Sequence, residues 1–188
     1  MAKIISRMSD DEVALRKSIE LDSHNASVHY NLGYLLAKDP ARAHEAAAAY
    51  HKAIELEPNN ARFVYRLGLL LHENLHGFAE AEIAYRRAIE LAPADPYYYC
   101  GLVSLLVQQQ RRSDALMLGA RMRELLNVNE NWYGLATLDA ILGNVEEAIE
   151  SLRKAADSDN FNREWARIDP DLAAIRGHDS FDEIVGIV

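Results

Sequence analysis

The chain has 188 residues, of which 49% are apolar and 26% charged, a composition typical of one globular domain or a short array of repeats. Its net charge of −9, from 29 acidic and 20 basic residues, argues against sequence-independent nucleic-acid binding. No segment has the roughly 20 consecutive apolar residues of a membrane helix, and MAKIISRMSDDE at the N-terminus lacks the apolar core of a signal peptide. The single cysteine, Cys100, fits a reducing compartment, so we expect a cytoplasmic protein.

The first predicted element is a helix within DEVALRKSIELDSHN, residues 11–25. Two segments that repeat each other follow it. The following columns are identical at a spacing of 35 residues: Ala46/Ala81, Tyr50/Tyr85, Ala53/Ala88, Ile54/Ile89, Glu55/Glu90, Leu56/Leu91 and Pro58/Pro93. Leu32-Gly33 recurs as Leu67-Gly68 at the same distance. Chance does not produce so many matches at one spacing, so the chain contains an internal repeat.

Each repeat reads as two antiparallel helices that stack on the next pair. Small alanines and glycines at fixed offsets let the helices approach closely, and large side chains such as Tyr50 fill the space beside them. Pro58 and Pro93 end helices, while Asp39-Pro40 has the pattern of an N-cap followed by the first helical residue. Because no single pair buries its own apolar face, stacking is obligatory and the array ends need caps.

The pattern resembles the tetratricopeptide repeat (TPR), which reads aromatic, two residues, Leu-Gly, then Ala, three residues, aromatic, and finally Pro. Two copies match it well, although His29 and Val64 replace the first aromatic residue. A degenerate third copy and a fourth copy follow. The third copy matches the pattern at Tyr99, Leu102, Ala115, Gly119 and Met122. The fourth copy matches it at Trp132, Leu135, Ala136, Ala148, Leu152 and Ala155. The resemblance, to a short array of bacterial type, implies an all-α fold: a right-handed superhelix of antiparallel helix pairs, or TPR α-solenoid.

The resemblance also divides the chain into segments of one array. Residues 11–25 would be the second helix of a repeat whose first helix is missing or shrunken. FNREWARIDPDLAAIRGHDSFDEIV, which begins at Phe161, is similar to the helices that close bacterial TPR arrays. We therefore expect a cap at 1–25, repeats at 26–60 and 61–95, a degenerate repeat at 96–128, a repeat at 129–162 and capping helices at 163–188.

HENLH, residues 72–76, spells the zinc-protease signature in which two histidines one helical turn apart bind the metal. The repeat predicts that the helix under His72 and Glu73 ends there, and that His76 and Gly77 form the connection to the next helix. No suitable third ligand follows downstream. We therefore interpret HENLH as a repeat turn and expect no metal site, cofactor or catalytic residue; a zinc hydrolase is the least favoured alternative. Cys100 lies in the column of Tyr30, Tyr65 and Tyr133, so a packing role is favoured over a nucleophile.

The first helices of TPR pairs line a groove that usually receives a peptide or a partner helix. Helical spacing assigns the following residues to that groove: Tyr30, Asn31, Tyr34, Arg62, Tyr65, Arg66, Leu69, Tyr97, Ser104 and Tyr133. Tyr30, Tyr65 and Tyr133 share one register and could form an aromatic track or pack one helix on the next. Arg62 and Arg66 are one turn apart and could hold a carboxylate, or could pair with neighbouring acids such as Glu73.

The sequence thus predicts a non-enzymatic scaffold that binds a protein or peptide and contacts neither nucleic acid nor membrane. In one alternative, Arg62, Arg66 and Asn31 resemble part of the carboxylate clamp with which TPR co-chaperones bind acidic C-termini. In another, the incomplete N-terminal repeat presents an open end on which copies of the chain assemble.

Overall fold

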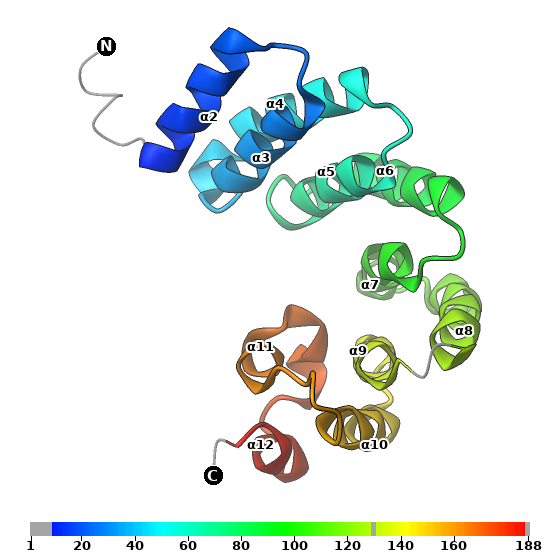
Figure 1. Cartoon of the computed structure of the whole chain (residues 1–188). Coiled ribbons are helices and arrows are strands. Elements are labelled where there is room, and N and C mark those ends of the chain that lie inside the picture. The colour runs from blue at the N-terminus through cyan, green and yellow to red at the C-terminus, as the bar shows by residue number, and fades with distance from the viewer. Residues whose placement is uncertain (1–8, 129–130, 187–188) are drawn as a thin grey trace. The chain divides into compact units, whose positions relative to one another are not determined.

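The computed structural model of the chain describes residues 9–128 and 131–186, and every regular element in these residues is helical (Figure 1). The all-α class and the repeated helix pairs predicted from the sequence are confirmed. By their internal contacts the residues form two compact units, Met1–Pro93 and Ala94–Val188. The predicted repeat boundaries stay a prediction, and the one at residue 129 lies outside the described residues.

The described part of unit 1, from residue 9 onwards, contains one helix followed by two helix pairs. Its elements are α2 (Asp10–Leu21), α3 (Ala26–Leu36), the 3-10 turn η1 (Pro40–Arg42), α4 (Ala43–Leu56), α5 (Ala61–Glu73) and α6 (Phe78–Leu91). Asp39 is the N-cap of η1, and its carboxylate accepts a hydrogen bond from the amide of Ala41 at 3.0 Å. Helices α4 and α6 end two residues before Pro58 and Pro93, as expected for residues that cannot continue a helix.

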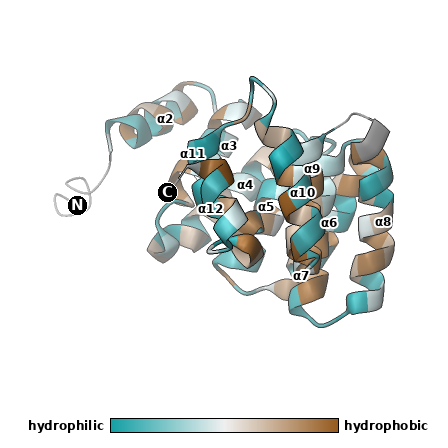
Figure 2. Ribbon diagram, turned by 90° about the horizontal axis from the view of Figure 1, so that it is seen from below, coloured by the Kyte–Doolittle hydropathy of each residue, from teal (hydrophilic) through white to brown (hydrophobic). Residues whose placement is uncertain are grey.

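Unit 2 contains two further pairs and a short helical tail. Its elements are η2 (Pro96–Tyr99), α7 (Cys100–Gln108), α8 (Arg112–Val128), α9 (Trp132–Leu142), α10 (Val145–Ala156), α11 (Arg163–Ile168), η3 (Pro170–Ile175) and α12 (Asp179–Val185). The tail packs onto the last pair, where Phe181 and Val185 join Ala148 and Leu152 in one buried cluster. Hydrophilic and hydrophobic residues alternate along the helices (Figure 2). Within the described ranges, no helix combines the length and apolarity of a membrane span.

The two helices of a pair approach closely where a small residue faces a large one. A Cβ atom added at Gly33 would lie 2.8 Å from the Tyr50 ring, and one added at Gly68 would lie 2.9 Å from the Tyr85 ring. Both rings are buried. The same two columns hold Val103 and Gly119 in the third pair and Ala136 and Leu152 in the fourth. The small and large positions are therefore exchanged in the third pair, where Val103 and Gly119 are both buried.

The two pairs of unit 1 share a core, because residues of the second pair complete the core of the first. Leu67 and Leu70 of α5 pack in the same buried cluster as Leu32, Leu36 and Tyr50 of the α3–α4 pair. The first pair thus depends on its neighbour for burial of apolar surface, which is the physical basis of a solenoid.

Helix α2 is attached to the first pair by an ion-pair network. Glu12 is the one residue of α2 that is buried among the described side chains. Its carboxylate accepts hydrogen bonds from the Arg42 guanidinium at 2.7 and 2.8 Å and from Arg16 Nε at 3.0 Å, and Arg42 also binds Glu45. The apolar contribution of α2 comes from the half-buried side chains of Leu15 and Ile19. The attachment of α2 therefore combines a small apolar contact with the carboxylate of Glu12.

We predict that Gly33→Ala destabilises the protein by about 1–2 kcal/mol, because overpacking against Tyr50 costs about 1–3 kcal/mol and the higher helix propensity of alanine returns up to about 1 kcal/mol. In a Tyr50→Leu background, which gives the Ala/Leu combination of the fourth pair, the same change should cost less. Urea unfolding of the four proteins measures the coupling. An equal cost of Gly33→Ala in both backgrounds would show that the ring is not the obstacle.

We predict that acid loosens α2 before the rest of unit 1. The hydrogen bonds from Arg42 hold the pKa of Glu12 below its ordinary value of 4.5. A carboxyl group whose pKa is lowered by folding stabilises the folded state above its unfolded pKa, and this stability is lost as pH falls through the lower folded value. Amide hydrogen-exchange protection of α2, measured at pH 6 and pH 3, should therefore fall more than that of α4.

The Glu12→Gln variant should show weakened α2 protection already at pH 6, by about 1.5–3 kcal/mol of opening free energy, the range for hydrogen bonds to charged groups. Glu20→Gln, an exposed change on the same helix, serves as the control. Equal protection of α2 at both pH values in the wild type would contradict the assignment.

Candidate functional site

Tyrosine rings and arginine side chains meet where α3 and α5 lie side by side in unit 1. The Arg62 guanidinium lies over the Tyr30 ring at 5.1 Å from its centre, and that of Arg66 lies over the Tyr34 ring at 5.4 Å. In each helix the two residues are four apart, so both contacts fall on one face. We call this region the α3–α5 surface, defined by Tyr30, Asn31, Tyr34, Lys38, Arg62, Arg66 and Leu69.

The tyrosine rings of the α3–α5 surface are held in different ways. Tyr30 stacks on Phe63 with ring centres 4.9 Å apart and an interplanar angle of 23°, and it also contacts the Tyr50 ring at 5.8 Å. Tyr34 is 46% exposed, and the Lys38 ammonium lies 5.3 Å from the centre of its ring. A cation over an exposed ring gains about 0.5–1 kcal/mol, which restricts the cation without neutralising it.

The arginines of this surface differ from several arginines on the other helices. Ion pairs with acidic residues are formed by Arg42 with Glu12 and Glu45, Arg86 with Glu82, Arg87 with Glu90, Arg111 with Asp114 and Arg121 with Glu124. In the described part of the chain, Arg62 and Lys38 form no ion pair with an acidic side chain. An acidic chain thus presents a local basic face beside two tyrosines, which is suited to an anionic ligand.

Three other predicted residues of unit 1 differ in their exposure. Asn31 is exposed and Leu69 is half-buried, so both can contribute to the rim of the surface. Tyr65 is only 3% exposed, and its ring packs against that of Tyr85 with centres 5.5 Å apart. In this structure Tyr65 belongs to the core of its own helix pair, although it shares a helical register with Tyr30.

The predicted residues of unit 2 lie in separate environments. Tyr97 is 45% exposed and meets the Tyr98 ring edge-on, whereas Ser104 is half-buried on α7. The hydroxyl group of Tyr133 donates a hydrogen bond to the Asp169 carboxylate at 2.6 Å, and its ring contacts Phe161. Burial and this carboxylate raise the pKa of Tyr133. Tyr133 thus connects α9 to the C-terminal tail.

Cys100, the first residue of α7, lacks the surroundings of an activated nucleophile. Burial raises the pKa of its thiol to about 12, and the negative charges of Asp171 and Asp169 act in the same direction. A reactive cysteine needs the opposite, a positively charged neighbourhood that favours the thiolate.

The HENLH segment does not lie on one continuous helix. Helix α5 ends at Glu73, His76 adopts a positive φ of 52°, and α6 begins at Phe78. The imidazole Nδ1 of His72 lies 3.3 Å from the Tyr85 hydroxyl group. The chain thus turns within the motif, as the repeat predicted, and the two histidines are not placed on one helical face. No cluster of three metal-ligating side chains occurs in residues 9–128 and 131–186.

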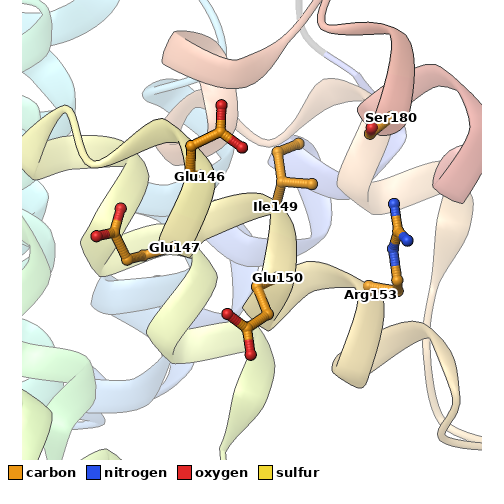
Figure 3. Close-up of a pocket in the computed structure, with 6 residues that line it drawn as sticks. All are labelled: Glu146, Glu147, Ile149, Glu150, Arg153 and Ser180. Carbon is orange, nitrogen blue, oxygen red and sulfur yellow. The ribbon is translucent and has the colours of Figure 1, made fainter.

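A shallow depression between α10 and α12 in unit 2 carries acidic side chains. Figure 3 shows Glu146, Glu147, Ile149, Glu150, Arg153 and Ser180 around it. The three carboxylates point in different directions (Figure 3), and Glu150 is paired with Lys154 at 2.7 Å. They do not converge on one point, so the depression has no arrangement that would bind a cation or a substrate.

Sequence reasoning missed several contacts between distant residues. The pairing of Glu12 with Arg42 spans 30 positions, and that of Tyr133 with Asp169 spans 36. Arg123 also pairs with Asp139, a carboxylate that is fully buried on α9. One signal could have indicated Asp139: it is a charged residue at a position where the other repeats have an apolar residue. The residues that pair with each other over these distances leave no periodic pattern in the sequence.

Comparisons with known proteins agree with this architecture. The chain matches models of the tetratricopeptide repeat family over residues 39–96 and 130–162. No curated protein shows significant sequence similarity to it. Among solved structures, YrrB, described as a TPR protein with an unusual peptide-binding site, is 21% identical with a TM-score of 0.54, covering 92% of this chain and 87% of that one.

Two further structures are similar. MamA is 18% identical with a TM-score of 0.59, covering 80% of this chain and 86% of that one. Yeast Tom70 is 23% identical with a TM-score of 0.65, and 98% of this chain aligns with 40% of Tom70. At these identities the likeness establishes the fold.

We predict that Cys100 reacts slowly with iodoacetamide in the folded protein. With a pKa of about 12, the thiolate fraction at pH 8 is about three orders of magnitude below that of an ordinary cysteine, whose pKa is about 8.5. The rate, followed by mass spectrometry, should still rise between pH 9 and pH 10, whereas in urea it should level off. A plateau near pH 9 in the folded protein would contradict the raised pKa.

Proposed function

Because this chain is a tetratricopeptide repeat protein, we propose that it is a non-catalytic interaction module that binds a segment of a partner protein on the α3–α5 surface. Tyr30, Asn31, Tyr34, Arg62, Arg66 and Leu69 are the proposed contacts. Tyr97 and Ser104 of unit 2 stay predicted contacts, and Tyr65 and Tyr133 act through packing. The cytoplasmic location expected from the single cysteine is part of the proposal.

The observation that carries the proposal is the placement of two arginines and a lysine over tyrosine rings. Each ring gives a partner a large contact area at a low cost in side-chain entropy. Arg62 and Lys38 form no ion pair with an acidic side chain of the described residues, so their positive charges are not neutralised by the chain itself. An extended peptide with acidic side chains complements both features, through apolar contact with the rings and charge-assisted hydrogen bonds to the arginines.

A more specific alternative is that Arg62, Arg66 and Asn31 bind the terminal carboxylate of the peptide. The support for it is that both arginines project from adjacent turns of α5 towards α3, where they can act on one carboxylate. The structural similarity to YrrB, which has a peptide-binding site, supports a peptide as the ligand class. Amidation of the peptide C-terminus separates the two alternatives, because it removes the terminal charge and leaves acidic side chains unchanged.

We predict that Arg62→Ala/Arg66→Ala lowers the affinity for selected peptides at least tenfold, because a hydrogen bond to a charged group contributes about 1.5–3 kcal/mol. Peptides of random sequence would be selected on the full chain and their binding measured by fluorescence anisotropy. Affinity should also fall as salt concentration rises, since exposed charges are screened.

Arg86→Ala/Arg87→Ala is the matched control, since it removes two exposed arginines from α6 that already pair with Glu82 and Glu90. This variant should bind like the wild type. If the two double variants bind the selected peptides equally well, the α3–α5 surface is not the binding site.

A further inference from the structure

Among the described residues, helix α2 is packed on one side only. The IEL tripeptide of residues 19–21 aligns it with α4, in which the same tripeptide spans residues 54–56. The α4 residues that pack within their own pair are Ala46, Ala49, Tyr50 and Ala53, all buried, and the corresponding α2 residues are Asp11, Ala14, Leu15 and Ser18. Of these four, all but the half-buried Leu15 are exposed. The attachment of α2 therefore rests on the adjacent face, which shares Leu15 and carries Glu12 and Ile19.

The connection from α2 to α3 lacks the helix-breaking residue of the next two connections. Ser23 occupies the column of Pro58 and Pro93. Residues 22–25, Asp-Ser-His-Asn, contain neither proline nor glycine, so each of them can adopt helical dihedral angles at moderate cost. Elsewhere a proline prevents the two flanking helices from joining.

The geometry points to exchange of α2 between two copies of this chain. In the exchanged dimer, residues 22–25 become helical and join α2 to α3 in one continuous helix. The α2 face with Glu12, Leu15 and Ile19 then packs on α3 and α4 of the second copy, and Glu12 binds Arg42 of that copy. The contacts of α2 with α3 and α4 are remade, whereas the side-chain cap of Asn25 on Val28 and the contact of His29 Nε2 with the Ser23 carbonyl are not. The two forms therefore differ mainly in the connection and in the entropy of association.

The Glu12–Arg42 contact makes this exchange testable by complementary charges. Glu12→Arg places like charges together in its own chain, and so does Arg42→Glu. When the two variants are mixed, both exchanged contacts of the mixed dimer join opposite charges. The arginine introduced at position 12 meets the glutamate introduced at position 42 of the other chain, and Glu12 of that chain meets Arg42 of the first. We expect the mixture of full-length variants to contain at least tenfold more dimer than either variant alone at the same total concentration, as measured by size-exclusion chromatography with light scattering.

Ser23→Pro provides the second test, because it blocks the continuous helix without disturbing the monomer. Asp22 has φ −144° and ψ 94°, close to the values of Glu57 and Ala92, which precede Pro58 and Pro93. This extended conformation is the one that a following proline favours. Ser23→Pro should abolish the dimer and keep the thermal stability of the monomer, whereas Ser23→Ala, the matched control, should keep the dimer.

The proposal is overturned if the mixture of charge variants forms no more dimer than its components. It is also overturned if Ser23→Pro dimerises as well as Ser23→Ala. A wild type that remains monomeric after incubation at about 1 mM would overturn it too, because about 1 mM is the effective concentration that a short linker typically gives its two ends. Peptide binding on the α3–α5 surface is measured separately, so failure of the exchange leaves the proposed function untouched, and the converse holds.

Discussion

The structure depends on one constraint: no helix pair closes a core by itself. The α3–α4 pair is completed by Leu67 and Leu70, which come from the next pair. Each pair therefore needs a neighbour, and both ends of the described chain need a different solution. At the C-terminal end the solution is apolar, with Phe181 and Val185 buried against α10. At the N-terminal end it is largely ionic, because Glu12 is the residue that α2 buries.

The difference between the two ends has energetic consequences. An apolar contact such as that of Phe181 weakens little with pH or salt. A carboxylate held by Arg42 and Arg16 depends on its ionisation, and removal of one partner leaves the charges of the network unbalanced in a partly buried place. The N-terminal end is thus the part of unit 1 in which a change of solution conditions acts most directly on structure.

The sequence alone predicts the helices and their turns well, because these follow from local rules. Asp39-Pro40 begins a helical segment where its chemistry requires one, and the HENLH segment turns where the repeat demands a connection. The arrangement of Tyr30, Tyr34, Arg62 and Arg66 on one surface also follows from helical spacing combined with the 35-residue period. The environment of individual tyrosines could not be predicted, since a shared register defines a helix face but not what packs on it. Tyr30 rests on Phe63, Tyr65 is enclosed beside Tyr85, and Tyr133 is bound by Asp169.

The exchange of small and large residues between the paired columns has an evolutionary consequence. If one column at a time changes fully from Gly33 with Tyr50 to the Val103 with Gly119 arrangement, the chain crosses either a state with two large residues or one with two small residues, whereas Ala136 with Leu152 shows an intermediate combination. The first is sterically overfilled and the second leaves a cavity, and both are destabilising. The two columns are therefore expected to covary among related sequences, and a statistical coupling between them would report helix contact in families for which no structure has been determined.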